Sequence, residues 1–351
     1  MRVSLAYTHL SHHAARSGYD QVVRYLADRV AVDRLEAKMP RHVPWRAWQW
    51  ADRMLASEWY DIWALTIEAG AARRLIGGPE TVHLLYAEDT YRHLGSLPAA
   101  LRNRRARIVC TYHQPPEKLR ALLPSDRRLR RLDGAVALNA EQAAFLAERI
   151  GDERVFTVPH GVDTSHFAPR NGAAPPAEPG ADPVCLFVGS WLRDFDVLDE
   201  VVRLVGEREP AVRFRVLTSD ERLSTLRELP NVEAVGRVDD DALLREYQSA
   251  DLFLLPLTDC TANNSLLEAM ACGLPLVATD VGGVRDYASV DCAALVPPRD
   301  GQAMAEAVLA LCRDDGRREA MGRAARGRAL ELDWDRVAGR LVDVYEAVGS
   351  A

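Results

Sequence analysis

The sequence predicts an α/β protein made of two doubly wound, Rossmann-like domains. Short β-branched runs alternate with longer amphipathic stretches in both halves of the chain, a pattern typical of parallel strands joined by helices. A Pro- and Gly-rich segment, residues 169–183, interrupts this alternation near the middle. At 351 residues the chain is also too long for one ordinary α/β domain.

The predicted strands are mostly apolar runs bounded by turn residues, which fits strands buried on both faces of a sheet. They span residues 2–7, 81–86, 107–112, 134–138, 155–158, 184–188, 213–217, 232–235, 252–255 and 276–278. The predicted helices span residues 19–30, 45–56, 141–149, 197–207, 241–248, 265–271, 301–312 and 317–330.

These elements predict an N-terminal domain over residues 1–168, a linker over 169–183 and a C-terminal domain over 184–333. In doubly wound sheets, the carboxyl ends of the strands and the N-termini of the helices face the same edge. The cleft between two such domains is therefore the expected ligand site.

The composition excludes several classes of protein. No apolar run approaches the roughly 20 residues of a membrane-spanning helix, and the N-terminus lacks the pattern of a secretory signal. We therefore expect a cytoplasmic protein. Its six cysteines include no Cys-x-x-Cys pair, so we expect reduced and mostly buried thiols rather than disulfides or a zinc site.

A net charge of −7 argues against general nucleic-acid binding. One region is nevertheless basic: Arg102–Arg131 holds ten basic residues and two acidic ones. It is either an ordinary solvated face or a patch that meets an anionic membrane surface or an acidic acceptor. Five tryptophans between Trp45 and Trp63 are interpreted mainly as core, with an acceptor platform or a membrane-contact face as the alternative.

The stretch from Ser249 to Asp286 carries the strongest chemical signal. A predicted strand ends there in a polar loop, and a helix follows that Gly273 and Pro275 terminate. Small polar residues before a helix leave backbone N–H groups that hold phosphate, although the same residues are ordinary helix caps. They are Asn263, Asn264 and Ser265.

Glu268 lies one turn into this helix. A carboxylate at that position either accepts two ribose hydroxyl protons or simply favours the helix dipole.

Three further candidates follow predicted strands. Arg193 comes after the strand at 184–188, where an arginine can hold phosphate in a bidentate manner. His113 comes after the strand at 107–112 and is expected to face the cleft. Glu88 and Asp89 follow the strand at 81–86 and are candidates for binding acceptor hydroxyls, with plain surface solvation as the alternative.

The sequence from Leu266 to Gly283 resembles the donor site of the GT-B glycosyltransferases, and specifically of the retaining group 1 enzymes of glycosyltransferase family 4. Residues 155–167 resemble the hinge-side signature of that family, and residues 332–346 resemble its closing helix.

The resemblance implies transfer of a sugar from a nucleotide-sugar donor, with retention of configuration and without a metal or other cofactor. Arg193 would neutralise the diphosphate, the backbone at Gly18 would approach it closely, and Glu268 would bind the ribose. His113 would lie near the transferred sugar. A final helix, residues 334–351, would cross back to the N-terminal domain.

Three positions depart from the family pattern. Ser17 stands where the family can have a second glycine beside Gly18. Cys260 stands where the family has its first glutamate, the one taken to contact the transferred sugar. Asp259 could substitute for it if the loop shifts by one residue, and Asn263 and Asn264 could supply polar contacts. Ser190 occupies the usual place of an arginine.

Other readings stay open. One is another GT-B chemistry, such as a nucleotide-sugar epimerase or a phosphorylase, and another is a degenerate member that binds a nucleotide sugar without turnover. The acceptor could be a glycan, a lipid-linked molecule at the inner membrane face, or a natural product.

Overall fold

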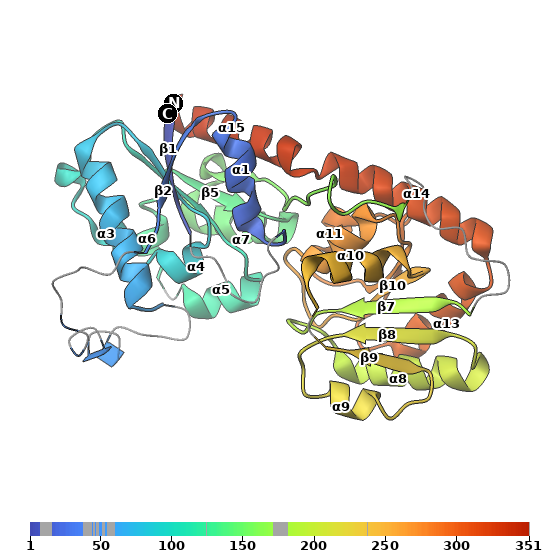
Figure 1. Cartoon of the computed structure of the whole chain (residues 1–351). Coiled ribbons are helices and arrows are strands. Elements are labelled where there is room, and N and C mark those ends of the chain that lie inside the picture. Colours follow the sequence, from blue (N-terminus) through green and yellow to red (C-terminus); the bar gives the residue numbers. More distant parts are fainter. Residues whose placement is uncertain are drawn as a thin grey trace. The chain divides into compact units, whose positions relative to one another are not determined.

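The computed structural model describes residues 1–7, 16–37, 44, 46, 49–50, 53–54, 60–123, 125–170, 182–236 and 238–350. The chain forms two compact units (Figure 1). The first unit comprises the described parts of Met1–His13, Tyr19–His160 and Asp335–Ala351. The second comprises those of Ala14–Gly18 and Gly161–Trp334.

The first unit is built on a six-stranded sheet with the order β2-β1-β3-β4-β5-β6. Its strands are β1 (Arg2–Ala6), β2 (Ala31–Leu35), β3 (Thr81–Leu84), β4 (Arg107–Thr111), β5 (Gly134–Ala137) and β6 (Val155–Thr157). Each neighbouring pair is parallel. The carboxyl ends of these strands therefore lie at one edge of the sheet, where ligand-binding loops occur in such folds.

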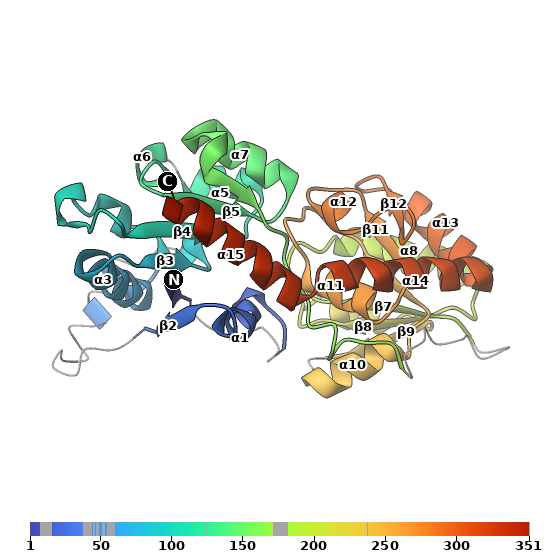
Figure 2. The same cartoon turned by 90° about the horizontal axis from the view of Figure 1, so that it is seen from above.

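Helices flank this sheet (Figure 2). The helical elements of the first unit are η1 (Tyr19–Gln21), α1 (Val22–Ala27), α3 (Ile62–Gly77), α4 (Ala87–Thr90), η2 (Leu94–Ser96), η3 (Ala99–Leu101), α5 (Pro116–Leu122), α6 (Asp126–Leu129), α7 (Ala140–Ile150), η4 (Asp152–Arg154) and α15 (Trp334–Ser350). Ile67 and Ala71 of α3 and Phe145 of α7 join the strands in one apolar core.

The last helix, α15, is tied to the sheet of the first unit by a buried polar chain. His83 on β3 lies 2.7 Å (Nδ1) from the Tyr345 hydroxyl and 2.8 Å (Nε2) from the Thr111 hydroxyl. Burial lowers the pKa of His83 to about 3, so the ring is neutral and donates from one nitrogen while it accepts at the other.

The second unit has a six-stranded sheet with the order β12-β11-β10-β7-β8-β9. Its strands are β7 (Val184–Val188), β8 (Arg213–Leu217), β9 (Val232–Val235), β10 (Leu252–Leu255), β11 (Leu276–Thr279) and β12 (Ala293–Val296). Its helices are α8 (Phe195–Arg208), α9 (Leu223–Leu226), α10 (Asp240–Gln248), α11 (Asn264–Ala271), α12 (Val284–Tyr287), α13 (Gly301–Cys312) and α14 (Asp315–Glu331). Neighbouring strands again run parallel.

Both faces of this second sheet are buried. On β10, Leu252 and Leu254 pack into the core formed with α8 and α13, whereas Phe253 and Leu255 pack into the core formed with α11 and α14. Side chains alternate between the two faces of a strand. An unbroken apolar run is therefore what a doubly covered strand requires, as the sequence predicted.

The predicted fold class is confirmed, and the differences concern single elements. The edge strands β2 and β12 and the helix α3 were not predicted. Asp61 caps α3 by accepting a 2.8 Å hydrogen bond from Ala64 N–H, which is an N-cap signal that was readable in the sequence. The predicted helix at 19–30 is shorter, because a 3-10 turn precedes α1. Most of the predicted helix at 45–56 lies outside the described residues.

The division between the units comes earlier than the expected end of the N-terminal domain at residue 168. The first unit ends at His160, because Val162 and Phe167 pack in the core of the second unit. At Gly161 a Cβ atom would lie 2.4 Å from the ring of Trp334. Most of the expected linker, residues 171–181, lies outside the described residues.

The described residues also bear on the remaining sequence expectations. The six cysteines are free thiols, and five of them are buried, as expected. Trp50 and Trp63 are 67% and 36% exposed, so the core assignment is wrong for these two; Trp45, Trp48 and Trp59 lie outside the described part. No helix among the described residues is long and apolar enough to cross a membrane.

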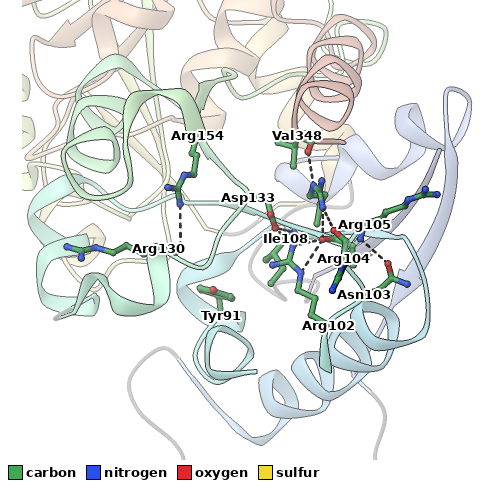
Figure 3. A network of polar contacts seen from close by, with 12 residues as sticks. Tyr91, Arg102, Asn103, Arg104, Arg105, Ile108, Arg130, Asp133, Arg154 and Val348 are labelled. Atoms are coloured by element: carbon green, nitrogen blue, oxygen red, sulfur yellow. Dashed lines mark hydrogen bonds and ion pairs between the residues drawn. The ribbon is translucent and has the colours of Figure 1, made fainter. Parts of the chain in front are cut away.

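The predicted basic region contains two kinds of arginine (Figure 3). Arg102 donates to the Ala106 carbonyl and to the Asp133 carboxylate, and Arg107 donates to the Val348 carbonyl of α15 at 2.9 Å. These side chains hold the unit together. The exposed arginines of the region are Arg104, Arg105, Arg120, Arg127, Arg128, Arg130 and Arg131.

Candidate functional site

The N-terminus of α11 is the centre of the polar cluster in the second unit. Asn263 is the N-cap, and its Oδ1 accepts hydrogen bonds from Leu266 N–H at 3.1 Å and from the Ser265 hydroxyl at 2.7 Å. The N–H groups of the first helical residues, Asn264 and Ser265, have no acceptor within the helix. They belong to the positive end of the helix dipole, which favours an anion at this place.

Arg193 connects the loop after β7 to this helix. Its guanidinium donates to the Val188 carbonyl (3.1 and 2.8 Å), the Trp191 carbonyl (3.0 Å) and the Ser265 hydroxyl (2.7 Å). All of these acceptors are uncharged, and among the described residues Arg193 forms no ion pair. Burial lowers the pKa of Arg193 to about 10, so the group stays protonated at neutral pH.

A glycine makes room for this guanidinium. Gly189 has φ +98°, and a Cβ atom there would lie 2.8 Å from Nη2 of Arg193. The absence of a side chain at this position is therefore required both by the backbone conformation and by the close approach of the arginine.

Glu268 is buried on the same helix. Its Oε1 accepts from the Ser17 hydroxyl, and its Oε2 accepts from the Tyr247 hydroxyl at 2.9 Å. Burial raises the pKa of the carboxyl, while both hydroxyls and the charge of Arg193 oppose that rise. The carboxylate thus has one donor on each oxygen and retains lone pairs for further donors.

The segment around Ser17 belongs to the second unit. Arg16 N–H donates to Asp240 at 3.1 Å, and the Arg16 guanidinium lies 3.4 Å from the Asp163 carboxylate. Gly18 follows with φ +102°, a conformation that favours glycine. The predicted donor-loop glycine therefore lies next to a contact of Glu268.

Cys260 stands at the position of the family's first glutamate but supplies no negative charge there. The thiol is buried, which raises its pKa to about 12, so it is neutral. A Cβ atom at Gly282 (φ +48°) would lie 2.1 Å from the Cys260 carbonyl and 2.9 Å from Oδ1 of Asp259. That oxygen also accepts from Cys260 N–H at 2.7 Å, so Asp259 is engaged in holding its own loop.

The first unit holds His113 in an aromatic cluster. Its Nε2 lies 2.7 Å from the Leu85 carbonyl, which only a protonated nitrogen can approach as a donor. The ring centroid lies 4.8 Å from that of Tyr19, 4.6 Å from that of Tyr86 and 6.5 Å from that of His160. These contacts fix the ring after β4, where the sequence placed it.

Glu88 and Asp89 lie in the first turn of α4, and Glu88 contacts His113. Glu88 Oε1 accepts from His113 N–H at 2.7 Å. Burial raises the pKa of both carboxyls above the ordinary range, and the neighbouring Asp89 raises the pKa of Glu88 further. Glu88 Oε2 and Asp89 Oδ1 are buried without a hydrogen-bond partner in the described part of the chain, so these atoms remain available to donors from a ligand.

The structure thus brings the predicted residues together in two groups. Arg193, Asn263 and Ser265 share direct hydrogen bonds in the second unit, whereas Ser190 is exposed and Asn264 is partly exposed. In the first unit Glu88 contacts His113, and Asp89 follows Glu88 in α4.

Sequence reasoning did not identify Ser17, Tyr247 or Asp240 as partners of the site. Ser17 stands beside the predicted Gly18, so its neighbourhood was indicated. Nothing in the local pattern of α10 distinguishes Tyr247 from a core tyrosine.

Comparisons with known proteins indicate the family of the chain. A family model described as "Glycosyl transferases group 1" matches residues 182–314. The D-inositol 3-phosphate glycosyltransferase of Nocardia farcinica is 30% identical over 315 residues, which cover 79% of this chain and 68% of that protein.

The protein of the same name from Xylanimonas cellulosilytica is 30% identical over 255 residues, which cover 66% of this chain. The chain spans 60% of the length of that relative.

The sucrose-phosphate synthase of Thermosynechococcus elongatus has a similar structure, with a TM-score of 0.72, 20% identity and 99% coverage of both chains. Two Rossmann-like units, each on a six-stranded parallel sheet, define a GT-B protein. The family model and the relatives agree with this fold, and the chain belongs to the group 1 glycosyl transferases.

Proposed function

We propose that this chain is a glycosyltransferase that moves a sugar from a nucleotide-sugar donor to a hydroxyl acceptor. One observation carries the proposal: the buried guanidinium of Arg193 reaches the N-terminus of α11 with only uncharged hydrogen-bond partners. A buried positive charge at the positive end of a helix is stabilised by an anion. The diphosphate of a nucleotide sugar supplies that anion.

The donor half of the site lies in the second unit. Arg193 and the first N–H groups of α11 stabilise the negative charge that develops on the departing diphosphate. The backbone at Gly18 approaches the phosphates, because glycine has no Cβ to keep them away. Glu268 accepts the ribose hydroxyls, as acidic residues do in dinucleotide sites.

Transfer in this proposal needs no metal ion. The guanidinium of Arg193 and the dipole of α11 provide the positive charge that a divalent cation provides in other phosphate sites. Activity measured after treatment with EDTA tests this point. Loss of activity that Mg²⁺ restores would contradict it.

The acceptor half lies in the first unit. In the neutral tautomer of His113, Nε2 carries the proton and Nδ1 is an acceptor. His113 orients the transferred sugar and its developing positive charge, while Glu88 and Asp89 bind acceptor hydroxyls. Configuration is retained, and the departing phosphate itself takes the acceptor proton, so no protein base is assigned.

The acceptor class is a hydroxylated molecule: a glycan, a lipid-linked molecule or a natural product. The names of two relatives refer to D-inositol 3-phosphate, which carries several hydroxyls. We further propose a cytoplasmic enzyme that meets the inner membrane face through the exposed arginines of the basic region. Sedimentation with anionic vesicles, compared with neutral ones, tests that contact.

A transfer assay tests the function. The protein is incubated with UDP-, GDP-, dTDP- and ADP-sugars, with and without polyol and lipid acceptors, and both the nucleoside diphosphate and the product anomer are measured. The proposal predicts that release of the diphosphate depends on an acceptor and that the anomer is retained. Donor turnover that no acceptor changes would favour an epimerase, and binding without consumption would favour a degenerate member.

A further inference from the structure

The carboxylate of Glu268 is held by two hydroxyl groups that come from distant parts of the sequence. Ser17 reaches Oε1 and Tyr247 reaches Oε2. Ser17 and Glu268 are separated by 251 residues but belong to the same unit. The two donors fix both the position and the rotation of the carboxylate plane.

The contact between Ser17 and Glu268 is supported by neighbouring contacts of the same segment. The preceding residue is fastened twice to the second unit, through Arg16 N–H to Asp240 and through the Arg16 guanidinium to Asp163. Asp163 in turn accepts hydrogen bonds from the backbone N–H of Ser165 and His166 at 3.1 and 3.0 Å. This chain of contacts places the Ser17 hydroxyl at Glu268.

We propose that Ser17 is a positioning residue of the donor site, whose hydroxyl keeps the Glu268 carboxylate ionised and oriented to accept the ribose hydroxyls. The inference rests on the proposed function and goes beyond it, because the family resemblance predicts a glycine at this place for close backbone approach. A glycine has no hydroxyl to donate, so the contact is a property of this chain.

The charges around Glu268 explain why a donor on Oε1 matters. Burial and Asp240 raise the pKa of Glu268, while Ser17, Tyr247 and Arg193 lower it. Burial, and after it the charge of Glu268, raise the pKa of Cys272 at the end of α11, so this thiol is neutral and adds no charge to the site. Without the Ser17 hydroxyl the pKa of Glu268 rises further, and a protonated carboxyl accepts fewer hydrogen bonds from a ribose.

The test uses the full chain and calorimetric titration with UDP, GDP, dTDP and ADP and with the 2′-deoxy forms of UDP, GDP and ADP. For the ribonucleotide that binds best, we expect Ser17→Ala to raise the dissociation constant about tenfold at pH 6 and less at pH 8.5. The same substitution should reduce the affinity for the 2′-deoxy form of that nucleotide by a smaller factor. Ser17→Thr, which keeps a hydroxyl, should restore binding.

The comparison between variants isolates the effect of Glu268. Protonation of the phosphates near pH 6 affects every variant alike, so the ratio of the variant and wild-type constants reports the carboxylate. Tyr247→Phe removes the other hydroxyl and serves as a second variant if Ser17→Ala does not fold.

Three outcomes decide between the readings. If Ser17→Ala weakens nucleotide binding equally at all pH values, and equally for the ribose and 2′-deoxyribose forms, the inference is overturned. Ser17 would then only maintain the structure of its loop. Unchanged binding would overturn it as well. If Glu268→Gln itself leaves ribonucleotide binding unchanged, the proposed ribose role fails, and with it the basis of the inference.

Discussion

The guanidinium of Arg193 donates a 2.7 Å hydrogen bond to the hydroxyl of Ser265, and this contact joins the loop after β7 to the first turn of α11. The same hydroxyl donates to Oδ1 of the capping residue Asn263. Arg193, the Ser265 hydroxyl and the helix cap Asn263 therefore form one hydrogen-bonded cluster. The donor-site proposal depends on this cluster.

Replacement of Arg193 is expected to reduce both stability and nucleotide binding. Arg193→Ala removes the hydrogen bonds that the guanidinium donates to the carbonyls of Val188 and Trp191, and we expect the free energy of unfolding to fall by about 3 kcal/mol. Arg193→Lys keeps the charge and should retain part of the binding. Thermal unfolding and nucleotide titration measure the two effects. Arg203→Ala, on the exposed side of α8, is the control and should change neither.

Removal of the α11 cap separates helix stability from anion binding. Asn263→Ala should cost about 1 kcal/mol of stability and should weaken nucleotide binding, since it frees Ser265 and Arg193. Asp300→Ala removes the matching cap of α13, where Asp300 accepts from Ala303 N–H at 2.8 Å. We expect a similar loss of stability there with normal nucleotide affinity. Equal binding losses in both variants would show that affinity follows global stability alone.

The Glu88 carboxyl predicts a pH dependence of folding. Burial raises its pKa from 4.5 to about 8, so the folded state keeps a proton that the unfolded state has lost. The stabilising contribution is complete below about pH 4.5 and is lost as the pH rises through about 8. One such group gives a slope of up to about 1.4 kcal/mol per pH unit.

Urea unfolding of the wild type and of Glu88→Gln between pH 5 and pH 9 measures that slope. The variant keeps an acceptor for His113 N–H but cannot ionise, so its stability should depend less on pH. Glu141→Gln, a change on the exposed first turn of α7, is the matched control. Identical slopes in wild type and Glu88→Gln would mean that this carboxyl is not a source of the dependence.

The crowded contact at Gly161 gives a purely steric prediction. A Cβ atom there would lie 2.4 Å from the Trp334 ring, whereas nothing lies within 4 Å of a Cβ atom at Gly339. Gly161→Ala should therefore lower the melting temperature by several degrees. Gly339→Ala should stabilise α15 by up to about 1 kcal/mol. A neutral Gly161→Ala would show that Trp334 can move aside at little cost.

Most of the fold was predictable because burial on both faces leaves a strong pattern. Strands β7, β8, β9 and β10 lie at their predicted residues. β7 and β10 are unbroken apolar runs, whereas β8 and β9 alternate apolar and charged residues between turn signals. Edge strand β2 was missed because its sequence, Ala-Val-Asp-Arg-Leu, carries charges on a half-exposed strand. Edge strands bury less surface and therefore need fewer apolar residues.

The polar cluster was predictable only in part. The cap residue Asn263 and the helix residue Glu268 follow from local rules about helix starts. The contact of Ser17 with Glu268 joins residues 251 positions apart, and that of Tyr247 with Glu268 joins two successive helices. No local rule predicts such pairs, because tertiary packing alone brings them together.

The most direct test of the donor site is calorimetric titration of the wild type and of Glu268→Gln with UDP, GDP, dTDP and ADP in the presence of EDTA. The account predicts that one nucleotide binds the wild type without metal. It also predicts that Glu268→Gln weakens that binding about tenfold or more, since the variant lacks the negative charge proposed to accept two ribose hydroxyl groups. If none of the nucleotides binds, or if the variant binds as tightly as the wild type, the proposed donor site is wrong.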